Sequence, residues 1–356
     1  MARRVFDADG HVIEYEPDLI QFLDPPYNWR GMNGFPLFPT LDGYHRIHIM
    51  TRITQKERMV WATAADWVDF MDATGIESTV VYPTAGLGYG LIQDPDWAVV
   101  LARGYNNYLY NKFYRESSRI GYVALVPFQD PEEAVKEVRR AVTELSAAGI
   151  CLAASPSDRG LRKPFGDKSF WPIYEEAEQL GVPIAVHTAV STGWGFDHFT
   201  KFGLTHNLEH PVGQMVAMTS IVMEGVLERF SKLKVAFLEA GVGWALYMLD
   251  RMDRSYQTWT GAYGVFQPPS DVARQGRMFF SVEPDEQILP YAVQRLGSEC
   301  MFFASDFPHE KTKESAIHEI AEFDEVEGLT EQDIDNILYL NGQRFYGKVP
   351  AAVGAA

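Results

Sequence analysis

The chain has 356 residues, and its 31 Lys and Arg against 48 Asp and Glu give a formal net charge of −17. Hydrophobic residues make up 46% of the chain and charged residues 22%, a composition that supports a large core and excludes a disordered chain, a coiled coil or a collagen-like fibre. Because nucleic acids are bound by clustered Lys and Arg, the acidic balance argues against a nucleic-acid partner. It argues, less strongly, against anionic membrane surfaces.

The chain has none of the sequence features expected of a secreted or membrane-spanning protein. Its two cysteines, Cys151 and Cys300, lie in apolar runs and are too few for a disulfide framework. Acidic residues precede any apolar run that could act as a signal peptide, and no stretch approaches the ~18 apolar residues of a membrane span. We therefore expect a cytoplasmic protein.

Short β-branched and aromatic runs alternate with helical stretches along the chain. Most runs are continuously apolar, as expected for parallel strands that are covered on both faces. The predicted strands are Val5–Asp9, Ser78–Pro83, Gly121–Pro127, Ile150–Ser155, Val182–His187, Lys234–Glu239, Met278–Val282 and Met301–Asp306. The predicted helices are Ala65–Thr74, Pro95–Ser118, Pro131–Ala148, Ser169–Leu180, Pro211–Phe230, Gly243–Thr258, Asp285–Leu296, Lys313–Glu325 and Thr330–Leu340.

This order of elements predicts an α/β fold, a (β/α)8 barrel of the TIM type, because eight strands alternate with helices over ~300 residues. A doubly wound open sheet is the competing architecture, but the glycine fingerprint of such folds is missing after the first strand. The nearest approach, 86–90, is interpreted as a flexible loop. We expect a single barrel domain over 1–348, extra helices after the eighth strand, and a flexible tail at 349–356.

A long segment after the first strand does not fit a plain barrel. It covers residues 12–65 and is rich in Pro and aromatic residues, including Phe22, Trp29, Phe35 and Phe38. A loop of this length is usually functional or disordered, and its apolar content argues against disorder. We expect a cap over the barrel mouth. A packing arm against a second subunit is the alternative, and a homodimer is compatible with the apolar faces of the helix at 211–230.

Polar residues are concentrated where the apolar strands end. The first strand ends in Asp9 and His11, the fifth in His187, the sixth in Glu239, and the eighth in Asp306. Catalytic groups of (β/α)8 barrels collect at the carboxyl ends of the strands, and residues i and i+2 share one face of a strand. Carboxylate oxygens and imidazole nitrogens that converge in this way form sites for divalent cations. The pattern therefore predicts a metal site with one or two ions of Zn, Fe or Mn.

Four motifs give the chain a family resemblance. It resembles the amidohydrolase superfamily, in the amidohydrolase-2 branch that contains aminocarboxymuconate-semialdehyde decarboxylase and resorcylate-type decarboxylases. The matching segments are DADGH at 7–11, PIAVH at 183–187, GVLERFSKLKVAFLEAGVGW at 225–244 and SDFPH at 305–309. The resemblance implies metal contacts from Asp9, His11, His187 and Asp306. It also implies that Asp306 accepts a proton from metal-bound water.

The sixth strand departs from the decarboxylase pattern. Those enzymes resemble one another in a catalytic histidine at this position, where the present chain has Glu239, followed by Ala240 and Gly241. Glu239 is interpreted either as a further ligand, of the same or a second cation, or as a general base beside a single cation. A carboxylate in place of the proton-carrying histidine favours metal-assisted hydrolysis.

Further polar residues complete the predicted site. His210, at the predicted start of a helix, could replace the missing histidine as a ligand or an acid. His309 could bind substrate or orient Asp306. Trp194 follows the fifth strand and is a candidate for substrate binding, and either Glu14 or Glu16 could support a ligand.

Two functions follow from this site. The main prediction is a metal-dependent hydrolase that uses an activated water on an amide, ester, thioester or C–C ketone bond of a hydrophobic or aromatic small molecule. The alternative is a metal-dependent, non-oxidative decarboxylase of an aromatic or enol carboxylic acid. A barrel that has lost catalysis and serves as a binding scaffold is a third reading, which the filled ligand positions argue against.

Overall fold

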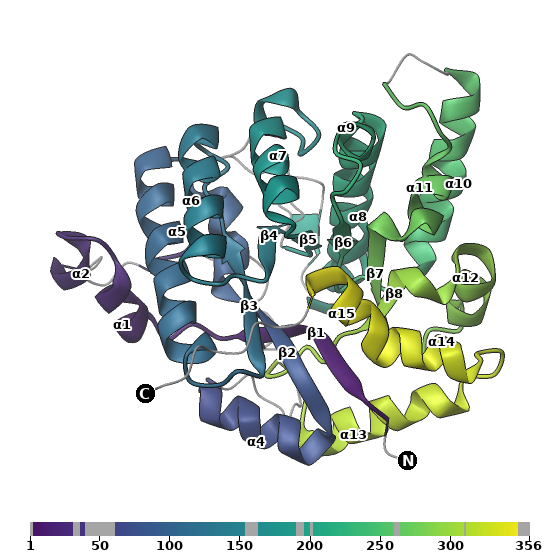
Figure 1. Cartoon of the computed structure of the whole chain (residues 1–356), viewed down its shortest axis with the longest axis horizontal. Coiled ribbons are helices and arrows are strands. Elements are labelled where there is room, and N and C mark those ends of the chain that lie inside the picture. The colour runs from purple at the N-terminus through teal and green to yellow at the C-terminus, as the bar shows by residue number, and fades with distance from the viewer. Residues whose placement is uncertain are drawn as a thin grey trace.

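The structure is a computed structural model that describes residues 3–30, 36–39, 61–153, 163–189, 196–199, 202–259, 264–309 and 311–347. Eight parallel strands form one sheet in the order β1 to β8, and together with the surrounding helices they make the expected (β/α)8 barrel (Figure 1). The strands are β1 (Val5–Val12), β2 (Ile76–Pro83), β3 (Ile120–Leu125), β4 (Gly149–Ala153), β5 (Ile184–His187), β6 (Val235–Phe237), β7 (Met278–Val282) and β8 (Met301–Phe303). All eight predicted strands are present.

The helices surround the strands (Figure 1), and along the chain they connect each strand to the next. The main helices are α4 (Ala64–Thr74), α5 (Pro95–Leu109), α6 (Pro131–Thr143), α7 (Trp171–Leu180), α8 (Phe202–Met223), α10 (Gly243–Thr258), α12 (Leu289–Leu296) and α13 (Lys313–Glu322). Shorter helices are α1 (Glu16–Leu19), α2 (Tyr27–Arg30), α9 (Val226–Arg229), α11 (Pro269–Val272), α14 (Glu331–Asp335) and α15 (Asn341–Tyr346). Side-chain caps at Thr63, Asp94 and Asp130 fix the starts of α4, α5 and α6.

The strands are apolar because both of their faces are covered. Every residue of β1, β3, β5, β6, β7 and β8 is buried. Their apolar residues belong to one continuous core that joins the barrel interior to the inner faces of the helices. This burial gives the strands a rigid frame, so the positions at which they end are well defined.

The first and last strands are joined through the segment that follows β8. The Asp306 amide donates to the carbonyl of Asp9 at 3.0 Å, and the His11 amide donates to the carbonyl of Phe307. Beneath these bonds, the buried carboxylate of Asp7 accepts hydrogen bonds from the Thr79 hydroxyl at 2.6 Å and from the backbone and hydroxyl of Ser305 at 2.7 and 2.8 Å. Asp7 therefore holds β2, β1 and the end of β8 together.

The described beginning of the long insertion lies against the flank of the barrel. Figure 1 shows α1 and α2 beside α5. Arg103 of α5 pairs with Asp24 at 3.0 Å, and Lys112 pairs with Asp18 at 2.8 Å. Residues 31–35 and 40–60, which the cap prediction also covers, lie outside the described residues, so the cap stays a prediction. The tail predicted at 349–356 also lies outside them.

The helix predicted at Pro211–Phe230 was placed wrongly. The observed α8 begins nine residues earlier and contains Pro211, and it ends at Met223. Gly225, in the left-handed conformation with φ of +82°, separates it from the single turn of α9. The prediction treated Pro211 as the first helical residue. The hydrogen bond that Pro211 cannot donate does not end a helix of this length, because packing stabilises the turns on both sides of it. The helix predicted from Asp285 begins only at Leu289.

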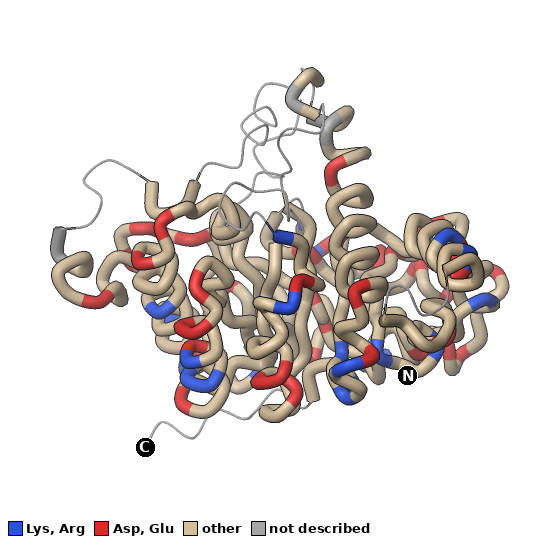
Figure 2. The backbone as a smooth tube through the Cα atoms, turned by 90° about the horizontal axis from the view of Figure 1, so that it is seen from above, with Lys and Arg blue, Asp and Glu red and all other residues tan. Residues whose placement is uncertain are grey.

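Charged residues of both signs occur on the outer helices of the described part of the chain. Along the outer helices, Lys and Arg alternate with Asp and Glu (Figure 2). Among the described residues, no helix is long and apolar enough to cross a membrane. Cys151 and Cys300 are both buried and unpaired.

We predict that Asp7 stabilises the barrel through its hydrogen bonds. Replacing Asp7 with Ala leaves the Thr79 and Ser305 donors buried without an acceptor, which should cost about 3 kcal/mol in the free energy of unfolding. Asp7→Asn should cost less than half of this, because the amide oxygen still accepts and the hydroxyl groups can turn to accept from its NH2 group. Urea unfolding measures both values, with Asp250→Ala on the exposed face of α10 as the control. A cost below about 1 kcal/mol for Asp7→Ala would contradict this role.

Candidate metal and catalytic site

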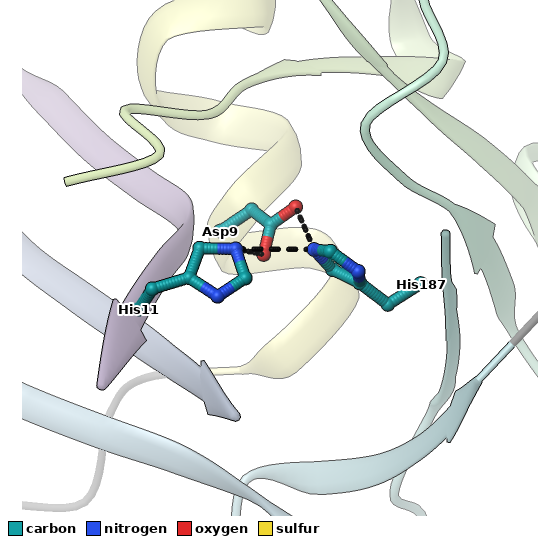
Figure 3. Close-up of side chains that lie close together, drawn as sticks. All are labelled: Asp9, His11 and His187. Atoms are coloured by element: carbon teal, nitrogen blue, oxygen red, sulfur yellow. Dashed lines mark hydrogen bonds and ion pairs between the residues drawn. The ribbon is translucent and has the colours of Figure 1, made fainter. Parts of the chain in front are cut away.

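Three side chains from two strands meet inside the barrel at the carboxyl ends of the strands. Asp9 and His11 come from β1 and His187 from β5, and all three are buried. The Asp9 carboxylate points between the two imidazole rings (Figure 3). His187 Nε2 lies 3.1 Å from His11 Nε2 and 3.5 Å from Asp9 Oδ2. His11 Nε2 lies 3.7 Å from Asp9 Oδ1. These three residues are called the buried trio below.

The backbone sets the proton positions on the two histidines. His11 Nδ1 lies 3.0 Å from the carbonyl oxygen of Pro83, and His187 Nδ1 lies 2.8 Å from the carbonyl oxygen of Thr188. A carbonyl only accepts, so in each ring Nδ1 carries the hydrogen and the Nε2 lone pair of the neutral ring is free. Two such lone pairs 3.1 Å apart repel each other unless a proton or a cation lies between them.

The spacing of Asp9 and His11 depends on the glycine between them. A Cβ atom at Gly10 would lie 2.3 Å from the Trp67 ring and 2.8 Å from the Thr79 hydroxyl, which are closer than atoms approach in proteins. The Trp67 indole also donates to the carbonyl of His11 at 3.2 Å. Gly10 thus lets α4 pack tightly on the strand end, and this contact fixes the position of the His11 backbone.

Two partly exposed carboxylates, Glu239 and Asp306, lie beside the buried trio and are called the outer carboxylates. Glu239 Oε2 is 3.4 Å from His187 Nε2, and Asp306 Oδ1 is 3.3 Å from His11 Nε2. Their side chains are 23% and 32% exposed, whereas those of the trio are at most 3% exposed. They therefore face the open end of the site.

Both outer carboxylates occur in an unusual backbone conformation. Glu239 and Asp306 follow β6 and β8 with φ of +56° and +55°, in the left-handed region that non-glycine residues rarely adopt. Such positions cost on the order of 1–3 kcal/mol each and persist where neighbouring contacts hold them. Here the Glu239 amide donates to the Ser281 hydroxyl at 2.8 Å, and the Thr188 hydroxyl donates to the Glu239 carboxylate at 2.5 Å.

His309 holds the second outer carboxylate. Its Nδ1 lies 2.7 Å from Asp306 Oδ1, and its ring lies against that of His11, with centroids 4.0 Å apart. Its Nε2 lies 2.9 Å from the Thr84 hydroxyl. The structure thus places His309 next to Asp306, and its role in orienting that carboxylate or in binding substrate stays a prediction.

His210 and Gln214, both on α8, lie behind the strand ends. The buried His210 ring makes a hydrogen bond with the Glu239 backbone and lies close to His206. The Gln214 amide donates to the carbonyls of Val186 and Leu238, at 2.9 and 2.8 Å, one residue before His187 and Glu239. α8 therefore sets the separation of two site residues. His210 was expected at a helix start, but it lies well inside α8 and is buried.

Burial and mutual charge shift the ionisation of the site. Burial raises the pKa of Asp9 to about 6 and that of Glu239 to about 7. Burial alone would lower the pKa of His187, but the carboxylates of Asp9 and Glu239 outweigh it and raise this pKa to about 10. Burial, with the neighbouring His309 and His187, keeps the pKa of His11 well below its ordinary value. Without a cation, the site must therefore retain protons to balance its charges.

The donor set fits a divalent cation. Ligand atoms of a tetrahedral zinc site, with bonds of about 2.0–2.1 Å, are about 3.3–3.4 Å apart, close to the separations found here. Asp9 Oδ1 is buried and accepts no hydrogen bond from any described residue, so it is available to a cation. Two groups of donors have all their ligand atoms within 4.8 Å of one another: Asp9, His11 and His187, and His11, Asp306 and His309. Because the groups share His11, they surround one region. Neither includes Glu239 or His210.

The structure brings together most of the residues that the sequence singled out. Asp9, His11, His187, Glu239, Asp306 and His309 converge, and His210 lies at their edge. Trp194 lies outside the described residues. The hydrogen-bonding residues Thr84, Thr188 and Gln214 were missed, because a single Thr or Gln in a sequence carries no signal of what it contacts.

The family model described as amidohydrolase matches residues 6–348 of the chain. The 2-amino-3-carboxymuconate-6-semialdehyde decarboxylase of Dictyostelium discoideum is 25% identical over 274 residues, which cover 76% of this chain and 73% of the relative. The gamma-resorcylate decarboxylase of Polaromonas sp. is 25% identical over 290 residues, covering 78% and 86%.

Solved structures share the same fold. An amidohydrolase from Mycobacterium avium subsp. paratuberculosis superposes with a TM-score of 0.76 at 21% identity, covering 98% of both chains. A dihydroxybenzoic acid decarboxylase from Polaromonas sp., solved with bound manganese and the inhibitor 2-nitroresorcinol, gives a TM-score of 0.69 at 20% identity and covers 97% of both chains. The family match over nearly the whole chain, with the barrel and its converging strand-end residues, shows that this protein belongs to the amidohydrolase family.

Proposed function

We propose that the site holds one divalent cation between the buried trio and Asp306. The support is geometric: the Nε2 atoms of His11 and His187, the unbonded oxygen of Asp9 and the nearby oxygen of Asp306 all face one region. The two donor groups share His11, which favours one ion over two. Manganese is bound in a solved decarboxylase of the same fold, so Mn²⁺ is the first ion to test.

The reaction that we propose is the non-oxidative decarboxylation of an aromatic or enol carboxylic acid. One observation carries this choice: the two donor groups that share His11, found among the described residues, lie in a chain that resembles two decarboxylases of such acids over about three quarters of its length. The hydrolase expected from the sequence is supported by the family match and by Glu239, but not by these two relatives. The proposed substrate is small and carries a hydroxyl or enol oxygen next to its carboxylate, so that both oxygens can reach the cation.

Each residue of the site has a part in this reaction. When bound, the cation supplies a positive charge that orients the carboxylate and hydroxyl oxygens of the substrate and stabilises negative charge on them. Asp9, His11, His187 and Asp306 hold the cation. Glu239, which belongs to neither donor group and is partly exposed, gives a proton to the carbon in this proposal. The bond from that carbon to the carboxylate breaks, CO2 leaves, and the electron pair left on the carbon takes the proton.

Hydrolysis is a second candidate, and Glu239 is the observation that favours it. A carboxylate 3.4 Å from His187 and beside the proposed cation would serve equally as a base for a water molecule. In that case Asp306 or Glu239 removes a proton from water, and the resulting hydroxide attacks an acyl carbon. The two candidates differ in their products, so one set of assays separates them.

Metal binding is predicted to depend on the trio and on pH. Elemental analysis of protein loaded with Mn²⁺ should give one ion per chain, and Asp9→Asn should weaken binding at least tenfold without unfolding the barrel. Because Asp9 and His187, with pKa values of about 6 and 10, keep protons that a cation must displace, affinity should rise from pH 6 to pH 8. Calorimetry in buffers of different ionisation enthalpy counts the released protons. Unchanged affinity in Asp9→Asn would remove this residue from the ligand set.

Decarboxylation is tested with ortho-hydroxybenzoic acids that carry ¹³C in the carboxyl group, in D2O, with Mn²⁺-loaded protein. We expect labelled CO2 and one deuterium at the carbon that lost it. Asp306→Asn should reduce turnover at least about a hundredfold yet fold normally, because Asn tolerates the left-handed conformation. Asp285→Asn, on the exposed surface, is the matched control. Cleavage of aryl esters or amides that Asp306→Asn abolishes, without any CO2 release, would establish the hydrolase instead.

A further inference from the structure

A buried carboxylate that belongs to neither donor group holds the loop next to the site. Glu14, two residues after β1, is 7% exposed. Its carboxylate accepts three backbone hydrogen bonds, from the amides of Thr84 at 3.1 Å, Ala85 at 2.8 Å and Gly86 at 3.0 Å. These residues begin the helical turn η4 (Ala85–Leu91), which follows β2. One side chain therefore satisfies three consecutive backbone donors of the loop.

The loop fits this carboxylate closely. A Cβ atom at Gly86 would lie 2.6 Å from the Cβ of Pro83 and 3.1 Å from Glu14 Oε1. Only glycine lets the third amide approach the carboxylate at this distance. Pro83, one residue before Thr84, also accepts the hydrogen bond of His11 Nδ1 at 3.0 Å. The loop anchored by Glu14 thus starts at a residue that already contacts the buried trio.

Thr84 connects the anchored loop to an outer carboxylate. Its hydroxyl lies 2.9 Å from His309 Nε2, and His309 Nδ1 lies 2.7 Å from Asp306 Oδ1. A threonine hydroxyl both donates and accepts, so it can bind the imidazole in either charge state. Glu14 is therefore linked to Asp306 by a series of contacts: its carboxylate binds the loop amides, the Thr84 hydroxyl of that loop contacts the His309 ring, and the ring contacts Asp306.

We propose that Glu14 and Thr84 are positioning residues: Glu14 fixes the Thr84 loop, and Thr84 in turn fixes the His309 ring that orients Asp306 in the catalytic site. The inference rests on the proposed function, in which Asp306 holds the cation. It adds residues outside the donor groups, Glu14 after β1 and Thr84 after β2, that set the orientation of the Asp306 carboxylate after β8. The Glu14 carboxylate contacts the backbone amide of Thr84 and not its hydroxyl. Glu14 and Thr84 therefore position His309 and Asp306 but do not pass protons to them.

The first test measures how firmly the His309 ring is held, without metal or substrate. NMR of ring-¹⁵N-labelled protein follows exchange of the His309 Nδ1 hydrogen with water, assigned by its loss in His309→Asn. Thr84→Val, which keeps the shape and removes the hydroxyl, should speed this exchange about five- to tenfold, the effect of one lost hydrogen bond. Thr84→Ser should restore the slow exchange. Equal rates in Thr84→Val and the unaltered protein would overturn the role of Thr84.

The second test asks whether Glu14 acts at a distance. Glu14→Gln places an NH2 group against the loop amides, so we expect faster amide exchange over residues 84–91 and faster exchange of the His309 Nδ1 hydrogen, each about fivefold or more. Glu16→Gln is the matched control, since the Glu16 carboxylate accepts from Leu37 at 2.8 Å instead. Faster exchange in the loop with no change at His309 would show that Glu14 supports the loop alone and would refute the proposal.

A third measurement tests whether Thr84 affects the rate of the reaction. If this protein is a decarboxylase, Thr84→Val should lower its kcat about tenfold while KM changes less than twofold. Thr84→Ser should recover most of the lost kcat. A merely structural role would lower the melting temperature and leave kcat of the folded fraction unchanged, which contradicts the proposal. If the protein releases no CO2 from any acid, the proposed reaction fails, while the two exchange measurements still decide whether Glu14 and Thr84 position His309.

Discussion

The closure of the barrel between its last and first strands is the constraint on which the site depends. The backbone bonds from Asp306 to Asp9 and from His11 to Phe307 join the ends of the sheet at the same residues that supply the donors. Asp7 secures this join one layer below, through Thr79 and Ser305. A shift of β8 along β1 would therefore break the fold and separate Asp306 from His11 together. The backbone bonds that close the barrel thus also set the distance between two candidate ligands, His11 and Asp306.

The same region carries an energetic cost. Four buried carboxylate and imidazole groups, those of Asp9, His11, His187 and His309, and two left-handed backbone positions are unfavourable in the absence of a cation. The raised pKa values of Asp9 and Glu239 reflect that burial. A divalent cation offsets it by taking the place of the retained protons. The surrounding scaffold, with Gln214 across β5 and β6 and Glu14 across the loop after β2, keeps the donors in place meanwhile.

Much of this was predictable from the sequence, for identifiable reasons. Continuous apolar runs marked all eight strands, and polar residues directly after those runs marked Asp9, His11, His187 and Asp306. The motifs that resemble the amidohydrolase superfamily agreed with the family found. What the sequence did not show were contacts between distant residues: Glu14 with the loop at 84–86, Thr84 with His309, and Gln214 with two strand ends. The left-handed conformation of Glu239 and Asp306 could not be predicted either, because neither residue type indicates it in a sequence. The preference for hydrolysis rested on one residue, Glu239, whereas the relatives favour decarboxylation.

One divalent cation is proposed to lie where the buried trio meets Asp306. Anomalous X-ray diffraction at the manganese edge, from crystals of Mn²⁺-loaded protein, tests it most directly. We predict a single strong peak within bonding distance of His11 Nε2, His187 Nε2, Asp9 and Asp306, with Glu239 outside the coordination sphere. A second peak bonded to Glu239 would contradict the single-ion account and support hydrolysis. A peak elsewhere in the barrel, or none in protein shown to contain manganese, would refute the site itself.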